Sequence, residues 1–402
     1  MRSSFLLAAA LVAATPATAA PRCSWQAAWS SAQLVPEGDN ALPAGRLADA
    51  TLRQVVRPSL GGARWRVRVS NVFGRAPLRI GAASVARSAD NGAARLVPGS
   101  VRPLTFAGAG AVAVPPGAEW LSDPVALDAP AFADLAVSLH LLADPDGQTS
   151  HPGSRATSWI AAGDATAAPD LPGARGTDHW FQLSGVEVER CAAPGGVVAF
   201  GDSITDGYGV PPNSNARWTD VLARRLGGRV AVLNAGIGGN RLLLDGLGPN
   251  AIARFDRDVL SQAGVRHVIV LEGVNDIGVL TRDRPASPAE HRALVAGITG
   301  AYAQIVARAR AHGIRAHVAT IMPFGGNGYY HPGAEAEADR QAVNAWIRTA
   351  GHVDEVIDFD RVMRDPAHPD RLLPAFDSGD GLHPSIAGYR AMAQAVPLAG
   401  LR

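Results

Sequence analysis

The stretch Val197-Val198-Ala199-Phe200-Gly201-Asp202-Ser203-Ile204-Thr205-Asp206-Gly207 decides the fold expected for the second half of this chain. Residues 197–200 are an apolar run typical of a buried strand, and the run ends at Gly201. Ser203 therefore stands at the carboxyl end of a predicted strand, in a turn where glycine lets the backbone approach a ligand closely. We interpret Ser203 as a candidate nucleophile; the alternative is a serine that caps a short helix.

Strand and helix patterns alternate beyond this stretch. Further apolar runs occupy residues 230–233, 267–271 and 316–321, and helical patterns occupy residues 217–226, 250–260, 288–312 and 334–349. Such alternation predicts an α/β fold, with a doubly wound parallel sheet between two layers of helices. In sheets of this kind, functional sites form outside the carboxyl ends of the strands.

The first half of the chain has a different pattern. Between residues 25 and 190, short strand-like segments such as 65–69 and 135–140 are separated by turn signals such as Asn91-Gly92. This pattern predicts a β-sandwich. Because the pattern changes near Cys191, we expect an accessory β domain over residues 21–190 and a catalytic domain over residues 191–402.

The first twenty residues have the pattern of a secretory signal peptide. Arg2 precedes an apolar stretch over residues 5–14, and small residues follow, ending in Ala17-Thr18-Ala19-Ala20. The apolar stretch is short for a membrane span, and the alternative is a buried N-terminal helix. We therefore expect export to the periplasm or the extracellular medium, without stable insertion in a membrane.

The cysteine count and the charge limit the partners. Export permits a disulfide between the two cysteines, Cys23 and Cys191, and two unpaired thiols are the alternative. The formal net charge is +1 and basic residues form no dense run, which argues against nucleic acid as the main partner. We predict no metal site and no cofactor, and the sequence makes no prediction about the oligomeric state.

A candidate base lies near the end of the chain, in Asp380-Gly381-Leu382-His383-Pro384. Asp380 and His383 are three residues apart on one loop, so a carboxylate–imidazole hydrogen bond can orient the ring. His383 could then accept the Ser203 proton and return it to a leaving alcohol. The alternative is an aspartate that caps the helix after Pro384, beside an exposed histidine.

Two more segments follow predicted strands and offer donors for an oxyanion. The segment over residues 234–240 contains Gly236, Gly238 and Gly239, and residues 272–276 contain Asn275. Taken separately, these residues could be turn glycines and a capping asparagine. Taken together, the four segments supply the nucleophile, the base with its orienting group, and the oxyanion donors that serine acyl transfer needs.

The set resembles the SGNH, or GDSL, hydrolase superfamily over roughly residues 195–402, with Gly-Asp-Ser at 201–203, Gly239, Asn275, and Asp380 with His383 as its blocks. The resemblance implies an SGNH-type, flavodoxin-like sheet. It also implies an oxyanion hole made by the N–H groups of Ser203 and Gly239 and the Asn275 side chain. Ile204 stands where the name motif has leucine. Residues 25–29 and 68–74 resemble the β-rich N-terminal region of exported acetylxylan-esterase-like or lysophospholipase-like members.

The prediction of the substrate depends on aromatic and polar residues near the candidate nucleophile. Candidate substrate contacts are Asp202 and Tyr208 beside the nucleophile, and Tyr329, Tyr330 and His331 in a later loop, where a packed surface loop is the alternative. We expect a secreted serine esterase that forms an acyl-enzyme and removes small acyl groups, chiefly acetyl, from a carbohydrate. The alternatives are a lysophospholipase or short-chain lipase or arylesterase, and a carbohydrate-binding protein with an inactive hydrolase fold.

Overall fold

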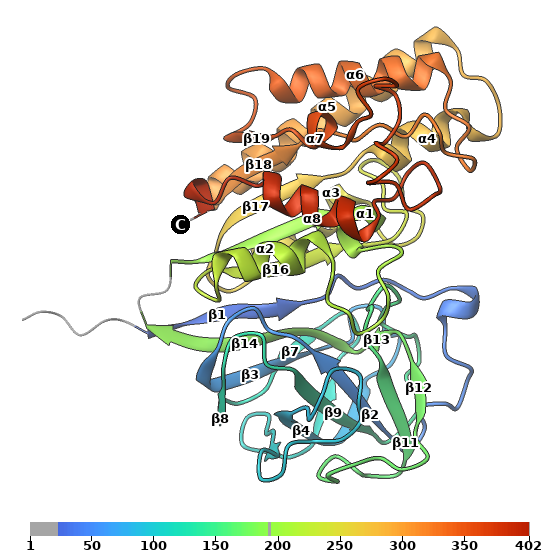
Figure 1. Cartoon of the computed structure of the whole chain (residues 1–402). Helices are drawn as coiled ribbons and strands as arrows, with labels where there is room; N and C mark the ends of the chain where they lie inside the picture. The colour runs from blue at the N-terminus through green and yellow to red at the C-terminus, as the bar shows by residue number, and fades with distance from the viewer. Residues whose placement is uncertain (1–22, 192–193, 402) are drawn as a thin grey trace, which may run out of the picture.

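The computed structural model describes residues 23–191 and 194–401 and divides into a β-rich region and an α/β region, which lie one above the other in Figure 1. The β-rich region ends with β14 (Leu183–Cys191), and the α/β region begins with β15 (Gly196–Gly201). The predicted signal peptide lies outside the described residues.

The β-rich region consists of antiparallel strands in two larger sheets and one small one. The first sheet contains β1 (Cys23–Ser30), β14, β3 (Gly62–Ser70), β7 (Glu119–Leu121) and β8 (Val125–Ala129). The second contains β12 (Arg175–Thr177), β11 (Ser158–Ala162), β2 (Ala50–Val56), β9 (Leu135–Leu141), β4 (Leu78–Arg87), β5 (Arg102–Pro103) and β6 (Val112–Val114). A two-stranded sheet pairs β10 (Ser150–His151) with β13 (Trp180–Phe181).

Apolar and charged side chains alternate along β3, which explains how the two larger sheets bury one core between them. Trp65, Val67 and Val69 are fully buried in a cluster that also takes side chains from β2 and β9 of the other sheet. The intervening Arg66 and Arg68 form ion pairs with Glu187 of β14. A period of two is what a strand with one face in a core requires.

The α/β region contains five parallel strands in the order β16-β15-β17-β18-β19. This is the order 2-1-3-4-5 of flavodoxin-like sheets, and β15 lies where the order reverses. Beside β15 the strands are β16 (Ala231–Gly236), β17 (Val265–Leu271), β18 (Arg315–Ala319) and β19 (Glu355–Ile357).

The helices of this region pack in two groups. One contains α2 (Trp218–Leu226), α7 (Phe359–Met363) and α8 (Ile386–Ala395); the other contains α3 (Ala251–Phe255), α4 (Val274–Arg282), α5 (Pro288–Ala311) and α6 (Ala334–Arg348). Right-handed crossovers from β15 to β16 and from β16 back to β17 place the two groups on opposite faces. The remaining short helices of this region are α1 (Ser203–Asp206), η2 (Asp256–Leu260) and η3 (Ala399–Leu401), and the β-rich region contains η1 (Gly38–Asn40).

The strands and helices predicted in this region are present with small shifts at their ends. The helix expected over residues 250–260 is the exception, because it consists of α3 followed by the π-helical turn η2. Helix α4 and strand β19 were not predicted. Val274–Arg282 follows a strand end directly, and its chemistry-bearing residues made it look like a loop.

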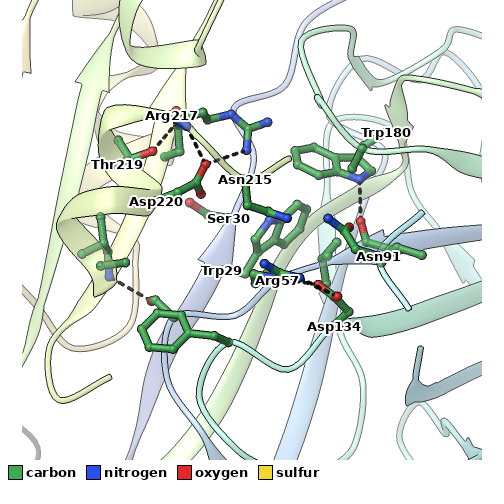
Figure 2. A pocket seen from close by; sticks show the side chains of 18 of the residues that line it. Trp29, Ser30, Arg57, Asn91, Asp134, Trp180, Asn215, Arg217, Thr219 and Asp220 are labelled. Carbon is green, nitrogen blue, oxygen red and sulfur yellow. Dashed lines mark hydrogen bonds and ion pairs between the residues drawn. The ribbon is translucent and has the colours of Figure 1, made fainter. Parts of the chain in front are cut away.

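The two regions share a continuous interface. Strand β1 lies beside β16, the edge strand of the parallel sheet (Figure 1). Ser59 of the β-rich region accepts a hydrogen bond from the N–H of Val232 on that edge strand (2.9 Å). A small cavity of about 50 Å³ lies at this interface. Figure 2 shows its lining, which includes the Arg57–Asp134 ion pair of the β-rich region together with Arg217 and residues of α2. The β-rich region therefore covers a sheet edge that would otherwise be open.

The predicted disulfide between Cys23 and Cys191 is confirmed. Its two residues are paired in register on the neighbouring strands β1 and β14, so the bridge joins the first and last strands of the β-rich region. In residues 23–191 and 194–401, no helix has both the length and the apolar character needed to cross a membrane.

Candidate active site

Ser203, His383 and Asp380 form one hydrogen-bonded chain at the carboxyl end of β15. The Ser203 hydroxyl lies 2.8 Å from Nε2 of His383, and Nδ1 of His383 lies 2.6 Å from Oδ2 of Asp380. The other carboxylate oxygen of Asp380 accepts the N–H groups of Leu382 and His383, which fixes the loop between them. A proton path from the Ser203 hydroxyl to His383 therefore exists in this structure.

The turn that presents Ser203 depends on Gly201. A Cβ atom at this position would lie 2.6 Å from the carbonyl oxygen of Leu271 and 2.3 Å from the Thr205 hydroxyl. Asp202 caps the short helix α1 by accepting the N–H of Ile204 (2.9 Å). Ser203 is therefore the first residue of a helix, where backbone N–H groups have no partner within the helix.

The surroundings of His383 favour its neutral form. Burial lowers the pKa of the His383 imidazole, and the Asp380 carboxylate opposes this shift only in part. Burial acts to raise the pKa of Asp380, but hydrogen bonds from the ring and backbone of His383 outweigh it, and that pKa lies below its ordinary value. The pair thus combines an ionised carboxylate with an imidazole ready to accept a proton.

The three oxyanion donors predicted from the sequence line the same cleft as this hydrogen-bonded chain. Ser203, Gly239 and Asn275 all line one cleft with His383, and the cleft has a volume of about 1030 Å³. The Gly239 N–H has no backbone partner among the described residues, and Gly239 has a φ of +69°, which favours glycine. A Cβ atom there would also lie 2.8 Å from the Leu247 side chain.

The Asn275 amide is held in one orientation by two partners. Its Nδ2 donates to the carbonyl oxygen of Asn240 (2.7 Å), and its Oδ1 accepts from the hydroxyl of Tyr330 (2.7 Å). Because an amide nitrogen carries two hydrogens, one N–H remains for an oxyanion. The Tyr330 ring lies so close to α4 that a Cβ atom at Gly278 would lie 2.4 Å from it.

Arg254 links the carboxyl ends of β15 and β16. This fully buried guanidinium donates to the carbonyl oxygens of Gly201 on β15 (2.9 Å) and Ala235 on β16 (2.7 Å), and to Oδ1 of Asn240 (2.9 Å). It also lies over the ring of Phe200, 4.1 Å from the centroid. One side chain therefore links the strand that carries the nucleophile to the segment that carries Gly239.

A group of buried carboxyls surrounds this cation. Glu272 and Asp258 form ion pairs with Arg254 (3.2 and 3.0 Å). Burial raises the pKa of Glu272 well above its usual value, that of Asp202 to about 7 and that of Asp276 to about 6. Asp276 accepts the N–H groups of Leu242 and Leu243, so it holds the segment after Asn240. Asp202 and Asp276 thus bind backbone N–H groups of the segments that follow the strands, whereas Glu272 and Asp258 bind Arg254.

The weaker candidates for substrate contact separate into two groups. Tyr208, Tyr329 and Tyr330 line the cleft, and the ring of Tyr208 stacks on His383 with 4.1 Å between centroids. Asp202 is buried as the cap of α1 and His331 is exposed outside the cleft lining, so the structure gives neither a position facing substrate. Tyr330 differs from Tyr329 because it is buried and bonded to Asn275.

Several residues around the site were missed from the sequence: Asn240, Arg254, Glu272, Asp276, Asn327 and Arg155. Asn327 accepts the N–H of Tyr330 and donates to the carbonyl oxygen of Asp380, so it links the two sides of the cleft. The adjacency of Asn275 and Asp276 was a usable signal. Arg254 lies inside a predicted helix, and no sequence signal marked it as a site residue, because its partners come from four separate segments. In the described parts of the chain, no group of three or more His, Cys, Asp or Glu residues could hold a metal ion.

Comparison with known proteins identifies the α/β region. Residues 199–391 match the model of the GDSL-like Lipase/Acylhydrolase family. The uncharacterized lipoprotein YqeF of Bacillus subtilis is 32% identical over 140 residues, which cover 34% of this chain and 52% of that protein. The chain thus spans about half the length of the curated relative it matches.

Solved structures of similar proteins include an aryl esterase of M. smegmatis and Est24, a carbohydrate acetylesterase from Sinorhizobium meliloti. The aryl esterase has 19% identity and a TM-score of 0.40, with 51% of this chain and 99% of that chain covered. Est24 has 21% identity and a TM-score of 0.38, with 52% and 99% covered. The match over residues 199–391 places the α/β region, rather than the whole chain, in the GDSL-like lipase/acylhydrolase family of SGNH/GDSL hydrolases.

Proposed function

We propose that this chain is an exported carboxylic ester hydrolase in which Ser203 is the nucleophile, His383 the general base and Asp380 the orienting acid. The observation that carries the proposal is the hydrogen-bonded chain from the Ser203 hydroxyl through His383 to Asp380. His383 removes the proton as the Ser203 oxygen attacks the ester carbonyl carbon. The same proton then goes to the leaving alcohol as the ester C–O bond breaks.

The acyl-enzyme is hydrolysed by the reverse sequence of proton transfers. A water molecule takes the place of the alcohol, His383 accepts its proton, and the acid leaves as Ser203 is protonated again. In both steps the carbonyl oxygen becomes an oxyanion. The N–H groups of Ser203 and Gly239 and the free N–H of Asn275 would stabilise it, and one donor of this kind is typically worth about 10²–10³ in rate.

For the substrate, the leading candidate is an acetylated carbohydrate. Tyr208 and Tyr329 line the cleft, and 49% and 60% of their respective surfaces are exposed. Exposed aromatic faces of this kind suit the apolar faces of sugar rings. On this proposal, the enzyme removes small acyl groups, chiefly acetyl.

A second candidate is a lysophospholipase or short-chain lipase or arylesterase, and it has its own supporting observation. Leu243, Leu244 and Leu247 are exposed on the loop that follows Asn240, and Leu247 lines the cleft. Exposed apolar side chains at a cleft mouth suit an acyl chain better than an acetyl group.

The test is a series of p-nitrophenyl esters from acetate to laurate, run beside release of acetate from acetylated xylan. The leading candidate predicts the highest kcat/KM for acetate and release from the polymer. A preference for long chains would select the lipase candidate. Ser203→Ala is the control. If the wild-type protein hydrolyses no ester in the series, the remaining candidate is a carbohydrate-binding protein with an inactive hydrolase fold.

The division of the chain is also part of the proposal. We infer a signal peptide over residues 1–20, a β-sandwich domain over residues 21–190 and a catalytic domain over residues 191–402. A disulfide between Cys23 and Cys191 suits a protein that folds outside the cytoplasm. Mass spectrometry of the N-terminus of the secreted protein tests the first boundary.

A further inference from the structure

A second hollow of about 250 Å³ adjoins the catalytic cleft on the side of the β-rich region. Gly238 and Leu247 line both the cleft and this side groove. The remaining lining combines residues of both regions, including Leu34, Glu37 and Arg155 from the β-rich region and Asp206 from α1. A molecule bound at Ser203 can therefore extend into a groove that the β-rich region helps to build.

Arg155 is held in this groove by a constrained backbone. Its φ of +48° lies in the left-handed region, which costs a non-glycine residue about 1 kcal/mol or more. The loop is kept in place by Asn213 of the α/β region, whose N–H donates to the carbonyl oxygen of Arg155 (2.8 Å) and whose Oδ1 accepts the N–H of Thr157 (2.9 Å). Strain of this kind persists where surrounding contacts enforce a position.

The guanidinium of Arg155 has no hydrogen-bond or ion-pair partner among the described residues, and its Nε is buried. Its contact is with the ring of Tyr208, whose centroid lies 5.8 Å away, and Tyr208 in turn stacks on His383. Other cations near the cleft are occupied: Arg282 is bound to Asp283 and to the Tyr329 hydroxyl, and Arg241 donates to the carbonyl oxygen of Asp245. The half-buried Arg155 guanidinium therefore has N–H donors available near the candidate base His383.

The acidic groups that line the side groove do not neutralise this cation. The Asp206 carboxylate is bound to His151 of the β-rich region (3.0 Å), and Glu37 is exposed to solvent. The two ring nitrogens of His151 lie near two oxygen atoms, Oδ1 of Asp206 (3.0 Å) and the carbonyl oxygen of Ala32 (2.7 Å). The Asp206 carboxylate thus has a partner other than Arg155.

We propose that Arg155 binds an anionic oxygen group, a carboxylate or a phosphate, on the alcohol part of the ester. The guanidinium presents its donors in the planar arrangement that matches two oxygens of such a group. The alcohol part is assigned to this side for two reasons. The leaving oxygen must receive its proton from His383, and Arg155 contacts the Tyr208 ring that stacks on His383. This inference rests on the proposed ester hydrolase function and narrows its substrates to acidic ones.

The test compares matched pairs of substrates that differ in one anionic group. An acetylated xylo-oligosaccharide bearing a glucuronate is paired with its carboxyl-reduced form, and a lysophosphatidic acid is paired with the corresponding monoacylglycerol. We expect the wild-type protein to prefer the anionic member of one pair, and that pair identifies whether the group is a carboxylate or a phosphate. Arg155→Ala should lower kcat/KM for this anionic substrate about 10- to 100-fold, mainly by raising KM. It should change kcat/KM for the neutral substrate of the same pair by less than about threefold.

Two further variants complete the design. Arg155→Lys keeps the charge and should retain part of the preference, whereas Arg79→Ala removes an exposed arginine of β4 far from the groove and should change nothing. The inference is overturned if the wild-type protein prefers the anionic member of neither pair, or if Arg155→Ala lowers both members equally. The proposed function is tested separately, since it fails if Ser203→Ala hydrolyses p-nitrophenyl acetate as fast as the wild-type protein does.

Discussion

The two sides of the catalytic cleft are built in different ways. On the oxyanion side, Asn275, Tyr330 and Arg254 are each at most 5% exposed and all belong to the α/β region. On the base side, the Asp380 side chain is 38% exposed, the Tyr208 ring that stacks on His383 is half exposed, and Arg155 comes from the β-rich region. Buried polar networks resist rearrangement because any broken hydrogen bond leaves an unpaired group in a low dielectric. The oxyanion side is thus rigid, whereas the base side is open to solvent and contacts the β-rich region.

The largest expected effect on the base side comes from Asp380→Asn. The substitution keeps the size of the side chain but removes the charge that stabilises the imidazolium and selects its tautomer. We expect kcat to fall about 10⁴-fold with KM little changed. Steady-state kinetics on p-nitrophenyl acetate measure this, and a loss of less than tenfold would assign the orienting role to another group.

The matching change on the oxyanion side is Arg254→Met, which removes a buried cation but keeps a long side chain. Glu272 and Asp258 would lose their ion pair, and breaking a buried pair in this way costs about 3–5 kcal/mol of unfolding free energy. Burial already raises the pKa of Glu272, and without the Arg254 charge this folded-state pKa rises further, so stability is lost as pH increases above the unfolded-state pKa of the carboxyl.

Urea denaturation of Arg254→Met and wild-type protein at pH 5 and pH 8 measures the effect. We expect a larger difference between the two proteins at pH 8. An equal difference at both pH values would mean that the Arg254 charge does not affect the pKa of Glu272. Arg282→Met is a control, because Arg282 forms its ion pair at the surface.

A smaller effect is expected from Tyr330→Phe, which removes the hydroxyl that fixes the Asn275 amide. We expect kcat to fall about tenfold, less than the 10²–10³ expected for Asn275→Ala, because the amide remains present but is free to turn. Tyr329→Phe is the matched control, since its hydroxyl contacts Arg282 at the surface. Equal kcat in both tyrosine variants would show that Asn240 alone orients the amide.

The smallest expected effect concerns pH. On the proposed mechanism, His383 must be neutral to accept the Ser203 proton, so activity should fall as pH drops through its pKa. Burial lowers that pKa below the ordinary value of about 6.5, and we therefore expect the acidic limb of kcat/KM to lie below pH 6.5. A limb at or above pH 6.5 would mean that the Asp380 charge outweighs burial.

The sequence predicted the base side and the oxyanion side unequally well. Ser203, Asp380 and His383 lie in two short segments whose spacing already indicates their chemistry, and the structure brings these residues within hydrogen-bond distance. Tyr330 was grouped with the surface aromatics, because the sequence contains nothing that distinguishes a buried tyrosine from the exposed Tyr329 beside it. Arg254 and Arg155 were missed, because the sequence around each arginine does not indicate which distant groups surround its guanidinium.

The sequence by itself determined the α/β fold and the four segments that carry the candidate chemistry. It could do so because strand periodicity and strand ends are local properties, and parallel strands bring their carboxyl ends to one edge. Only the tertiary structure decided that the β-rich region covers the edge strand and adds Arg155 to the cleft. Contacts between residues far apart in the chain depend on how two packed regions meet, and no local pattern encodes that packing.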